Sequence, residues 1–289
     1  MIFAMLLWGG GWPALKILTQ YVDVHIVTFW RFVIMTITFI PLLFIMNIPF
    51  VVPLKSLFYI SNSALLNTAF MFLAFYGVSY GSATGGGVII TTFSPLLTFA
   101  LLAFINKKRL NKREFFGISL GLIGGLIMFG LGFKSSSDFF SADLFFNSGN
   151  VFYLLAALSW AFITYLSQKA HHYIHPIHYS FMIALFSSTL LFLLTKEYDI
   201  WIVFDQGISF WLALIYLAVL GQSVATTIYF IASGKMGSSQ ASSFMFLVPL
   251  FSVISSYIVL DEVVELYVLL GGVISSLAVL ILNKKVQNS

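Results

Sequence analysis

Cysteine is absent from the 289 residues, and aspartate and glutamate together number only ten. The lack of cysteine excludes a disulfide framework, a thiolate metal site and a cysteine nucleophile. No set of Asp, Glu and His residues has metal-ligand spacing, and no glycine-rich phosphate-binding loop is present. We therefore expect neither a metal ion nor another cofactor.

Charged residues are also scarce, at 8% of the chain, against about 25% in an average soluble domain. Apolar residues make up 60%, and phenylalanine alone occurs 32 times. A soluble fold of this length cannot hide so much apolar surface. The composition therefore predicts an integral membrane protein in contact with the lipid bilayer. The net charge of +4 does not indicate a nucleic-acid partner, because the basic residues stand at the ends of apolar segments.

The apolar residues form ten segments, each about as long as the 20 residues that a helix needs to cross the hydrocarbon core. Runs such as 151–158 are apolar on every side, whereas a transmembrane strand alternates between apolar and polar residues. The sequence therefore predicts an all-α protein with ten transmembrane helices. The expected spans are 2–19, 25–46, 56–78, 83–105, 114–133, 148–168, 176–195, 208–232, 238–260 and 264–283.

Lysine and arginine are divided unequally between the two sides of such a bundle. One side carries three of them with nine acidic residues, and the other carries ten with a single acid, Glu114. Because short cytoplasmic loops are enriched in Lys and Arg, we expect both termini in the cytoplasm and the protein in the inner (plasma) membrane. The ten basic residues are Lys55, Lys107, Lys108, Arg109, Lys112, Arg113, Lys169, Lys235, Lys284 and Lys285.

The two halves of the chain repeat one another. Five helices in each half is an odd number, so the second copy must enter the membrane from the opposite side. We expect a first repeat over 1–133, a connecting loop over 134–147 and a second repeat over 148–289. A shift of 152 pairs Trp8 with Trp160, Tyr21 with Tyr173 and Phe29 with Phe181, and a shift of 154 pairs Pro95 with Pro249, Leu96 with Leu250 and Gly117 with Gly271.

The loops that follow the fourth helix of each repeat support this inversion. The first loop reads Lys107-Lys108-Arg109 and its counterpart reads Asp261-Glu262-Val263. Opposite charge at one position of the repeat is expected where the two copies face opposite compartments. Inverted repeats are typical of secondary transporters, which bind substrate near the midplane between the repeats.

Three features of the chain stand out: the opening Trp8-Gly9-Gly10-Gly11, the segment 29–32 (Phe-Trp-Arg-Phe) and the proline-centred fourth and ninth spans. In these features the chain resembles the EamA family of the drug/metabolite transporter superfamily. The resemblance covers nearly the whole chain. It implies ten helices in two repeats and a transporter of amino acids, purine derivatives or related metabolites. An acidic residue commonly follows the fourth helix in this family. Glu262 matches that position, whereas Lys108 occupies it in the first repeat.

Arg31 is the only charged residue well inside a predicted span, about seven residues and thus roughly 10 Å below the outer boundary. Its guanidinium presents a fork of donors suited to a carboxylate or a phosphate. One interpretation is an anion-binding group for a metabolite. The other is a structural arginine bonded to helix-end carbonyls or to Asp23.

Other residues in the spans complete the expected substrate pathway. Large rings at Trp8, Trp12 and Trp160 suit a planar or apolar ligand, although belt or packing roles are also typical of tryptophan. Mid-span prolines kink helices, so Pro95 and Pro249 are expected either to form a pair of gating helices or simply to set the shape of their helices. The remaining candidates carry hydrogen-bonding groups that either contact substrate or join helices, namely Asn67, Tyr76, Thr91, Gln222, Tyr229 and Gln240.

The sequence thus predicts a secondary transporter, an exporter or an exchanger, that moves a small metabolite such as an amino acid by alternating access. The alternative substrates are a nucleotide-like metabolite or a drug, and the alternative functions are a membrane-embedded enzyme or a channel. An enzyme needs acids or histidines for proton transfer, and the predicted interior has none. For the same reason we expect no proton-coupling carboxylate. A monomer and a homodimer are both compatible with the sequence.

Overall fold

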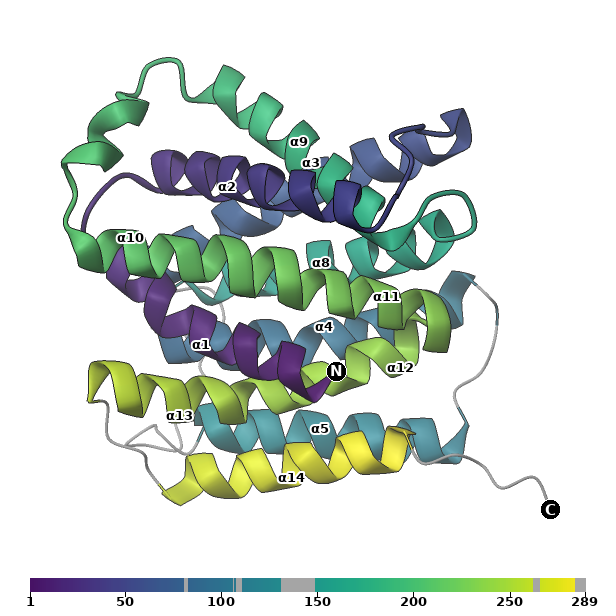
Figure 1. Ribbon diagram of the computed structural model, residues 1–289. Helices are drawn as coiled ribbons and strands as arrows, with labels where there is room; N and C mark the ends of the chain where they lie inside the picture. The colour runs from purple at the N-terminus through teal and green to yellow at the C-terminus, as the bar shows by residue number, and fades with distance from the viewer. Residues whose placement is uncertain (81–82, 106, 108–110, 131–148, 262–265, 284–289) are drawn as a thin grey trace.

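The computed structural model describes residues 1–80, 83–105, 107, 111–130, 149–261 and 266–283. Regular structure in these residues is entirely helical (Figure 1). The first half contains α1 (Ile2–Leu18), α2 (Val24–Ile45), α3 (Leu54–Tyr80), α4 (Ala83–Ile105) and α5 (Lys112–Gly130). The second half begins with α8 (Asn150–Ala170) and α9 (Pro176–Leu194) and ends with α14 (Leu266–Asn283).

Two spans of the second half are composite. The eighth consists of α10 (Ile208–Ile215), the π-helical segment η2 (Tyr216–Ala225) and α11 (Thr226–Met236). The ninth consists of α12 (Ser238–Ser243), the 3₁₀ segment η3 (Phe244–Leu247) and α13 (Val248–Leu260). A short 3₁₀ helix, η1 (Ile200–Asp205), lies between α9 and α10.

The chain is an all-helical membrane protein of ten helices in two inverted repeats, as the sequence predicts. Seven of the described helices are long and apolar enough to cross a bilayer, and Ile2–Leu18 and Leu269–Asn283 are shorter apolar helices. The remaining helix of the ten is α5. Its first three residues, Lys112, Arg113 and Glu114, are all charged, so only the part that follows them is apolar.

Helix pairing follows a pseudo-twofold relation between the halves. In the first half α1 packs on α13, and its counterpart in the second half, α8, packs on α4. Likewise α1 contacts the composite eighth span, whereas α8 contacts α3. The remaining pairs, α2 with α9 and α5 with α14, join equivalent helices directly. Exchanging the two halves therefore maps this set of contacts onto itself.

An uncommon backbone conformation recurs at equivalent positions of the two halves. Lys107 follows α4 with a φ of 49°, and Asp261 follows α13 with a φ of 52°. Both are left-handed conformations that non-glycine residues seldom adopt, and the two positions differ by the 154 residues of the repeat. The C-terminal end of α4 lies on the right in Figure 1 and that of α13 on the left, so the equivalent residues stand at opposite ends of the bundle.

Charge separates the two ends of the bundle accordingly. We call one end, on the right in Figure 1, the basic end; its described charges are Lys55, Lys107, Lys112, Arg113, Glu114, Lys169 and Lys235. The other end is the acidic end, with Lys16, Asp23, Lys196, Glu197, Asp199, Asp205 and Asp261.

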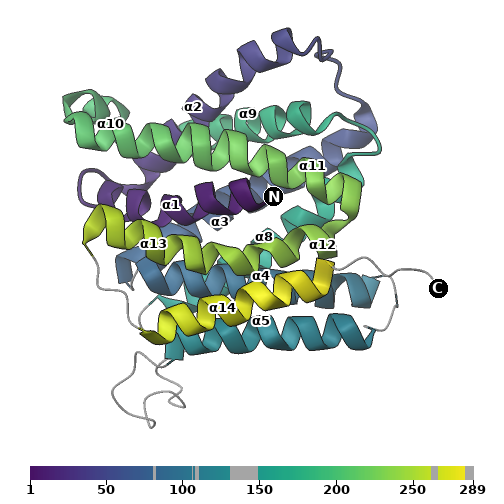
Figure 2. The ribbon, with the colours of Figure 1, turned by 60° about the horizontal axis from the view of Figure 1, so that its bottom comes forward.

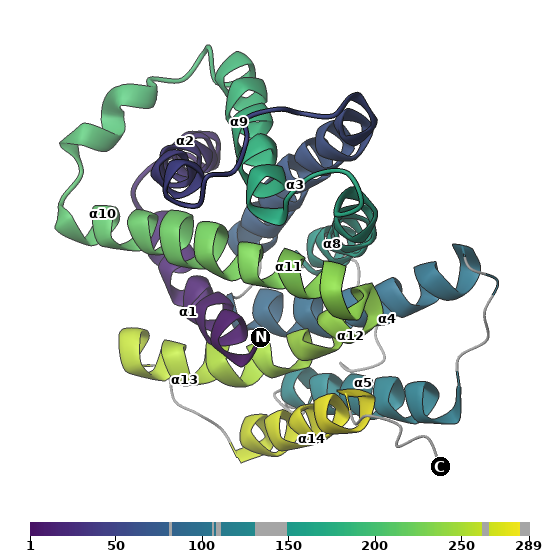
Figure 3. The ribbon, with the colours of Figure 1, turned by 45° about the vertical axis from the view of Figure 1, so that its right-hand side comes forward.

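The α5–α14 pair lies at one edge of the bundle, away from α2 and α9 (Figures 2 and 3). Small residues permit the close approach of its helices, as is common in membrane interiors. A Cβ atom at Gly117 would lie 2.6 Å from Leu282, and one at Gly124 would lie 2.7 Å from the Gly271 carbonyl oxygen. The pair therefore serves as a peripheral scaffold.

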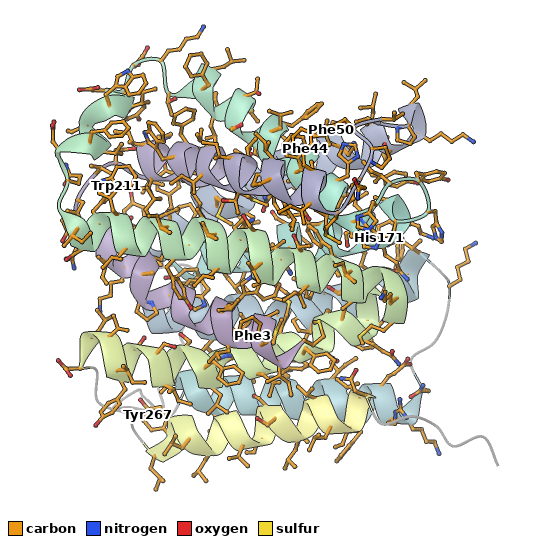
Figure 4. All side chains as sticks on the ribbon, in the orientation of Figure 1. Phe3, Phe44, Phe50, His171, Trp211 and Tyr267 are labelled. Carbon is orange, nitrogen blue, oxygen red and sulfur yellow. The ribbon has the colours of Figure 1, made fainter. Side chains whose placement is uncertain are left out.

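Large apolar side chains cover the outside of the bundle. Phe3 is 56% exposed and Phe44 is 63% exposed, and both project from their helices in Figure 4. The same view places Trp211 and Tyr267 at the acidic end and His171 at the basic end. Aromatic side chains at both ends of an apolar band match the two interfaces of a bilayer.

The inverted arrangement predicts opposite accessibility for equivalent residues. Lys112 begins α5 and Leu266 begins α14, both are exposed, and they differ by 154 positions. Because the chain lacks cysteine, Lys112→Cys and Leu266→Cys each provide a single thiol. In intact cells an impermeant maleimide is expected to label the Leu266→Cys protein and not the Lys112→Cys protein, which reacts only after the membrane is opened. Labelling of both from the same side would contradict the inversion.

Candidate functional site

A cavity of about 90 Å³ lies where the two halves of the chain meet. Because one water-sized group needs about 10–15 Å³, the space holds several such groups. Helices α1 to α4 line it from the first half, and α8, η2, η3 and α13 line it from the second half. The lining residues are Trp8, Gly11, Trp12, Leu15, Arg31, Phe70, Met71, Ala74, Ile90, Thr91, Trp160, Leu217, Gly221, Gln222, Met245 and Val248.

Arg31 supplies the charge of this cavity. It lies in α2 and is only 7% exposed. Its Nη2 atom donates to Oε1 of Gln222 at 3.0 Å, and its Nε atom has no hydrogen-bond partner among the described residues. Asp23 instead caps the beginning of α2, where its Oδ1 atom accepts from the His25 backbone N–H at 2.8 Å. The structural pairing of Arg31 with Asp23 is therefore not formed.

Gln222 reaches Arg31 from a π-helical segment. Two side-chain hydroxyls in and next to this ten-residue segment also bond to carbonyls five residues earlier, Ser223 to Ala218 at 3.0 Å and Thr226 to Gly221 at 3.4 Å. π-helical segments inside helices occur frequently at functional sites. The Gln222 side chain is 2% exposed, and its Nε2 atom has no partner among the described residues.

Three aromatic rings form a cluster at the cavity wall on the side of the basic end. The ring of Trp8 lies 5.1 Å from that of Trp160 at 87°, and Tyr229 lies 5.0 Å from Trp8 and 5.7 Å from Trp160. Trp8 is held in place because its Nε1 atom donates to the Gly221 carbonyl at 3.0 Å. The Tyr229 hydroxyl lies 2.9 Å from that of Thr164, so the cluster is bonded to the next layer.

That next layer is a hydroxyl network at the basic end, defined by Thr164, Ser167, Ser233, Ser238 and Gln168. The Thr164 carbonyl accepts from Ser167 at 2.8 Å, from Ser238 at 3.1 Å and from Ser233 at 3.3 Å. Ser238 lies within 2.7 Å of Gln168 Oε1 as well. The network joins α8, α11 and α12. Because its members come from three separate segments, no pattern in the sequence predicts it.

A different aromatic contact lies toward the acidic end, next to the lining residue Trp12. The fully buried Tyr153 ring lies against Gly77 of α3 and Gly86 of α4. A Cβ atom at Gly77 would come within 2.3 Å of this ring, and one at Gly86 within 2.7 Å. The same Cβ atom at Gly86 would also lie 2.7 Å from the Trp12 ring. Glycine is needed here because any side chain would displace the aromatic rings.

Six of the ten pathway candidates line the cavity: Trp8, Trp12, Arg31, Thr91, Trp160 and Gln222. Thr91 donates to the carbonyl of Gly87, one turn earlier. The other four candidates lie outside the lining.

Two of these four are buried near the cavity. Asn67 is 3% exposed, and its Oδ1 atom has no hydrogen-bond partner among the described residues. Tyr229 is fully buried behind the tryptophans. The other two are farther away: Tyr76 packs near His25 and Phe72 toward the acidic end, and Gln240 is exposed at the surface.

The two prolines both lie in the middle of their spans but in different local structures. Pro95 lies inside the continuous helix α4. Pro249 lies in the first turn of α13, after the 3₁₀ segment η3. Proline is well tolerated in a first turn, where the missing N–H would have no helical partner. Both prolines are buried, and neither lines the cavity.

The histidines of the loop between α8 and α9 stand apart from this site. Burial, together with the neighbouring His175 and His172, lowers the pKa of His171 to about 4. His171 is therefore neutral at physiological pH. Groups of three potential metal ligands are absent from the described part of the chain.

Residues 1–130 and 147–284 each match the EamA-like transporter family. The chain belongs to this family. Lys108 and Glu262, which occupy its acidic position in the two repeats, lie outside the described residues.

Two of the relatives below match nearly the full length of the chain, and the third matches three quarters of it. An uncharacterized transporter of Archaeoglobus fulgidus is 25% identical over 99% of this chain and 96% of its own. The uncharacterized transporter YoaV of Bacillus subtilis is 22% identical over 95% of this chain and 92% of its own. A chloroplastic WAT1-related protein of Arabidopsis thaliana is 28% identical over 75% of this chain and 52% of its own.

A protein of known crystal structure has a TM-score of 0.71 to this chain, with 17% identity over 97% of this chain and 94% of the other. This likeness shows the fold. The family and the relatives together identify the chain as a multi-pass membrane transporter.

The hydroxyl network makes a prediction about stability. Ser238→Ala removes a hydroxyl that lies within hydrogen-bond distance of the Thr164 carbonyl, Gln168 Oε1 and Ser233 Oγ. With one proton to donate, this hydroxyl donates to one of the first two and accepts from Ser233, and each such bond is worth about 0.6 kcal/mol in a membrane interior. We expect the free energy of unfolding to fall by about 1 kcal/mol, measured by thermal unfolding in detergent. Ser239→Ala is the matched control, since no side-chain hydrogen bond of Ser239 contributes to the network. Equal stability of the two variants would show that the network does not hold α12 to α8.

Proposed function

We propose that the chain is a secondary transporter, an exporter or an exchanger, that moves a small carboxylate-bearing metabolite by alternating access. Amino acids are one class of such metabolites. We place the protein in the inner membrane with the basic end and both termini in the cytoplasm, as a monomer or a homodimer. The observation that carries the proposal is the cavity itself, because helices of both repeats line it.

The packing on either side of the cavity offers candidates for the two gates that alternating access requires. Toward the basic end, the rings of Trp8, Trp160 and Tyr229 are bonded to the hydroxyl network. Toward the acidic end, Tyr153 packs against Gly77 and Gly86. Each of these clusters joins different helices, so we expect relative motion of the helices to open one side at a time. Pro95, inside α4, is a candidate hinge for the movement of that helix.

The chemistry of the lining favours transport over catalysis. Proton transfer in an enzyme requires positioned acids or histidines, and the cavity lining contains neither of these residue types. Arg31 and Gln222 offer hydrogen-bond donors to a bound carboxylate instead. The described acids all stand at helix ends, which supports facilitated export or exchange without a proton-carrying carboxylate.

A counterflow experiment tests transport and its site. Purified protein is reconstituted into liposomes preloaded with an unlabelled metabolite mixture, and entry of labelled amino acids and other carboxylates is followed. We expect saturable entry that requires the internal load. Gly11→Leu should reduce this entry at least tenfold, because a Cβ atom at Gly11 already lies 3.3 Å from Leu217 and the longer side chain fills the cavity.

Gly207→Leu is the control for this substitution, because a Cβ atom at Gly207 meets no atom within 4 Å. We expect it to transport as the unchanged protein does. Non-saturable flux that ignores the internal load would indicate a channel, and equal flux through both variants would place the pathway elsewhere.

A further inference from the structure

The cavity holds a positive charge that the described residues do not neutralise. Arg31 is 7% exposed, and its one described hydrogen bond goes to the uncharged amide of Gln222. The sequence contains only ten acids, and the six in the described part of the chain all stand at helix ends. A buried arginine without a counter-charge is costly in a membrane interior, and such residues typically mark a pathway for a charged substrate.

We infer that this cavity selects organic anions over zwitterions, and that its preferred ligand is a carboxylate attached to a flat apolar group without an ammonium group. The inference rests on the proposed transport function and narrows its substrate class. The net charge of the ligand determines its affinity, because a zwitterion is neutral overall and does not neutralise the positive charge of Arg31.

Two N–H donors in the wall of the cavity have no hydrogen-bond partner in the described structure. They are the Nε atom of Arg31 and the Nε2 atom of Gln222, and both are buried. The bond from Arg31 Nη2 to Gln222 Oε1 holds the two side chains together at 3.0 Å. A ligand carboxylate accepts from such N–H groups, and charge-assisted bonds of this kind are the stronger ones.

The rest of the lining suits an apolar ring. Trp8, Trp12, Phe70 and Trp160 contribute aromatic surface, and the rings of Phe70 and Trp160 lie 5.1 Å apart. An ammonium group would meet no carboxylate among these residues. It could instead pack on the face of a tryptophan ring. Binding in that way would favour ligands with an ammonium group over the simple carboxylate, which is the opposite order of affinities.

Four ligands of one skeleton separate charge from shape: 3-phenylpropionate, phenylalanine, 3-phenylpropionamide and 2-phenylethylamine. Each is added to the purified full-length protein at pH 7 and constant ionic strength, and dissociation constants are derived from the rise in Tm. We expect 3-phenylpropionate to bind at least tenfold more tightly than phenylalanine. The neutral amide and the cationic amine should bind more weakly still.

Two variants assign the preference to Arg31. Arg31→Gln keeps a hydrogen-bonding side chain and removes the charge, so the preference for 3-phenylpropionate over 3-phenylpropionamide should disappear. Lys235→Gln removes one positive charge from an exposed position at the basic end, and it should retain the preference. The apparent Tm of each variant without ligand shows that it is folded.

Three results would overturn the inference: phenylalanine binding as tightly as 3-phenylpropionate, an unchanged preference in Arg31→Gln, or no stabilisation by any of the four ligands. Counterflow of labelled 3-phenylpropionate separates this inference from the proposed function. Tight binding without counterflow would contradict transport and leave the charge selection standing. Counterflow of phenylalanine and 3-phenylpropionate with equal affinity would contradict the selection and leave transport standing.

Discussion

The hydrogen bond between Arg31 and Gln222 connects the two halves of the chain in the interior of the bundle. Arg31 comes from the first repeat and Gln222 from the second, and their atoms lie 3.0 Å apart in the wall of the cavity. A guanidinium in this environment must keep a polar partner, because an isolated buried charge is costly. The π-helical turn that presents Gln222 and the glycine whose carbonyl fixes Trp8 belong to the same segment. One local departure from α-helical geometry therefore positions the polar and the aromatic parts of the site together.

A symmetric framework surrounds an asymmetric interior. The helix pairs and the left-handed residues Lys107 and Asp261 follow the repeat. The side chains on either side of the cavity do not, since serine and threonine hydroxyls bond together toward the basic end and Tyr153 packs on two glycines toward the acidic end. Pro95 and Pro249 likewise occupy one place in the repeat but different local structures. The packing toward the two ends consequently differs in chemistry.

The sequence predicts the framework well because long apolar segments, charge asymmetry and repeated residues can all be recognised without knowing which helices pack together. It also predicts the conspicuous residues of the cavity, since a deep arginine and large tryptophans are rare in apolar spans. It does not predict the π-helical turn around Gln222, which depends on packing against α1 and α2. Nor does it predict the convergence of three serines on the Thr164 carbonyl, because no sequence pattern specifies that α8, α11 and α12 meet there. Gln240 illustrates the opposite error, since its residue type suggested the pathway whereas its helix directs it to the surface.

A double-mutant cycle on Arg31 and Gln222 tests most directly whether these two side chains form one anion-binding unit. Affinity for 3-phenylpropionate would be measured in the unchanged protein, in Arg31→Lys, in Gln222→Leu and in the double variant. If the hydrogen bond orients the guanidinium, either single change disrupts the unit and the second adds little, so the effects are strongly non-additive. The account predicts a coupling of at least about 1 kcal/mol, within the usual range for residues in contact. Additive losses would contradict it, because they would mean that each side chain acts on the ligand alone.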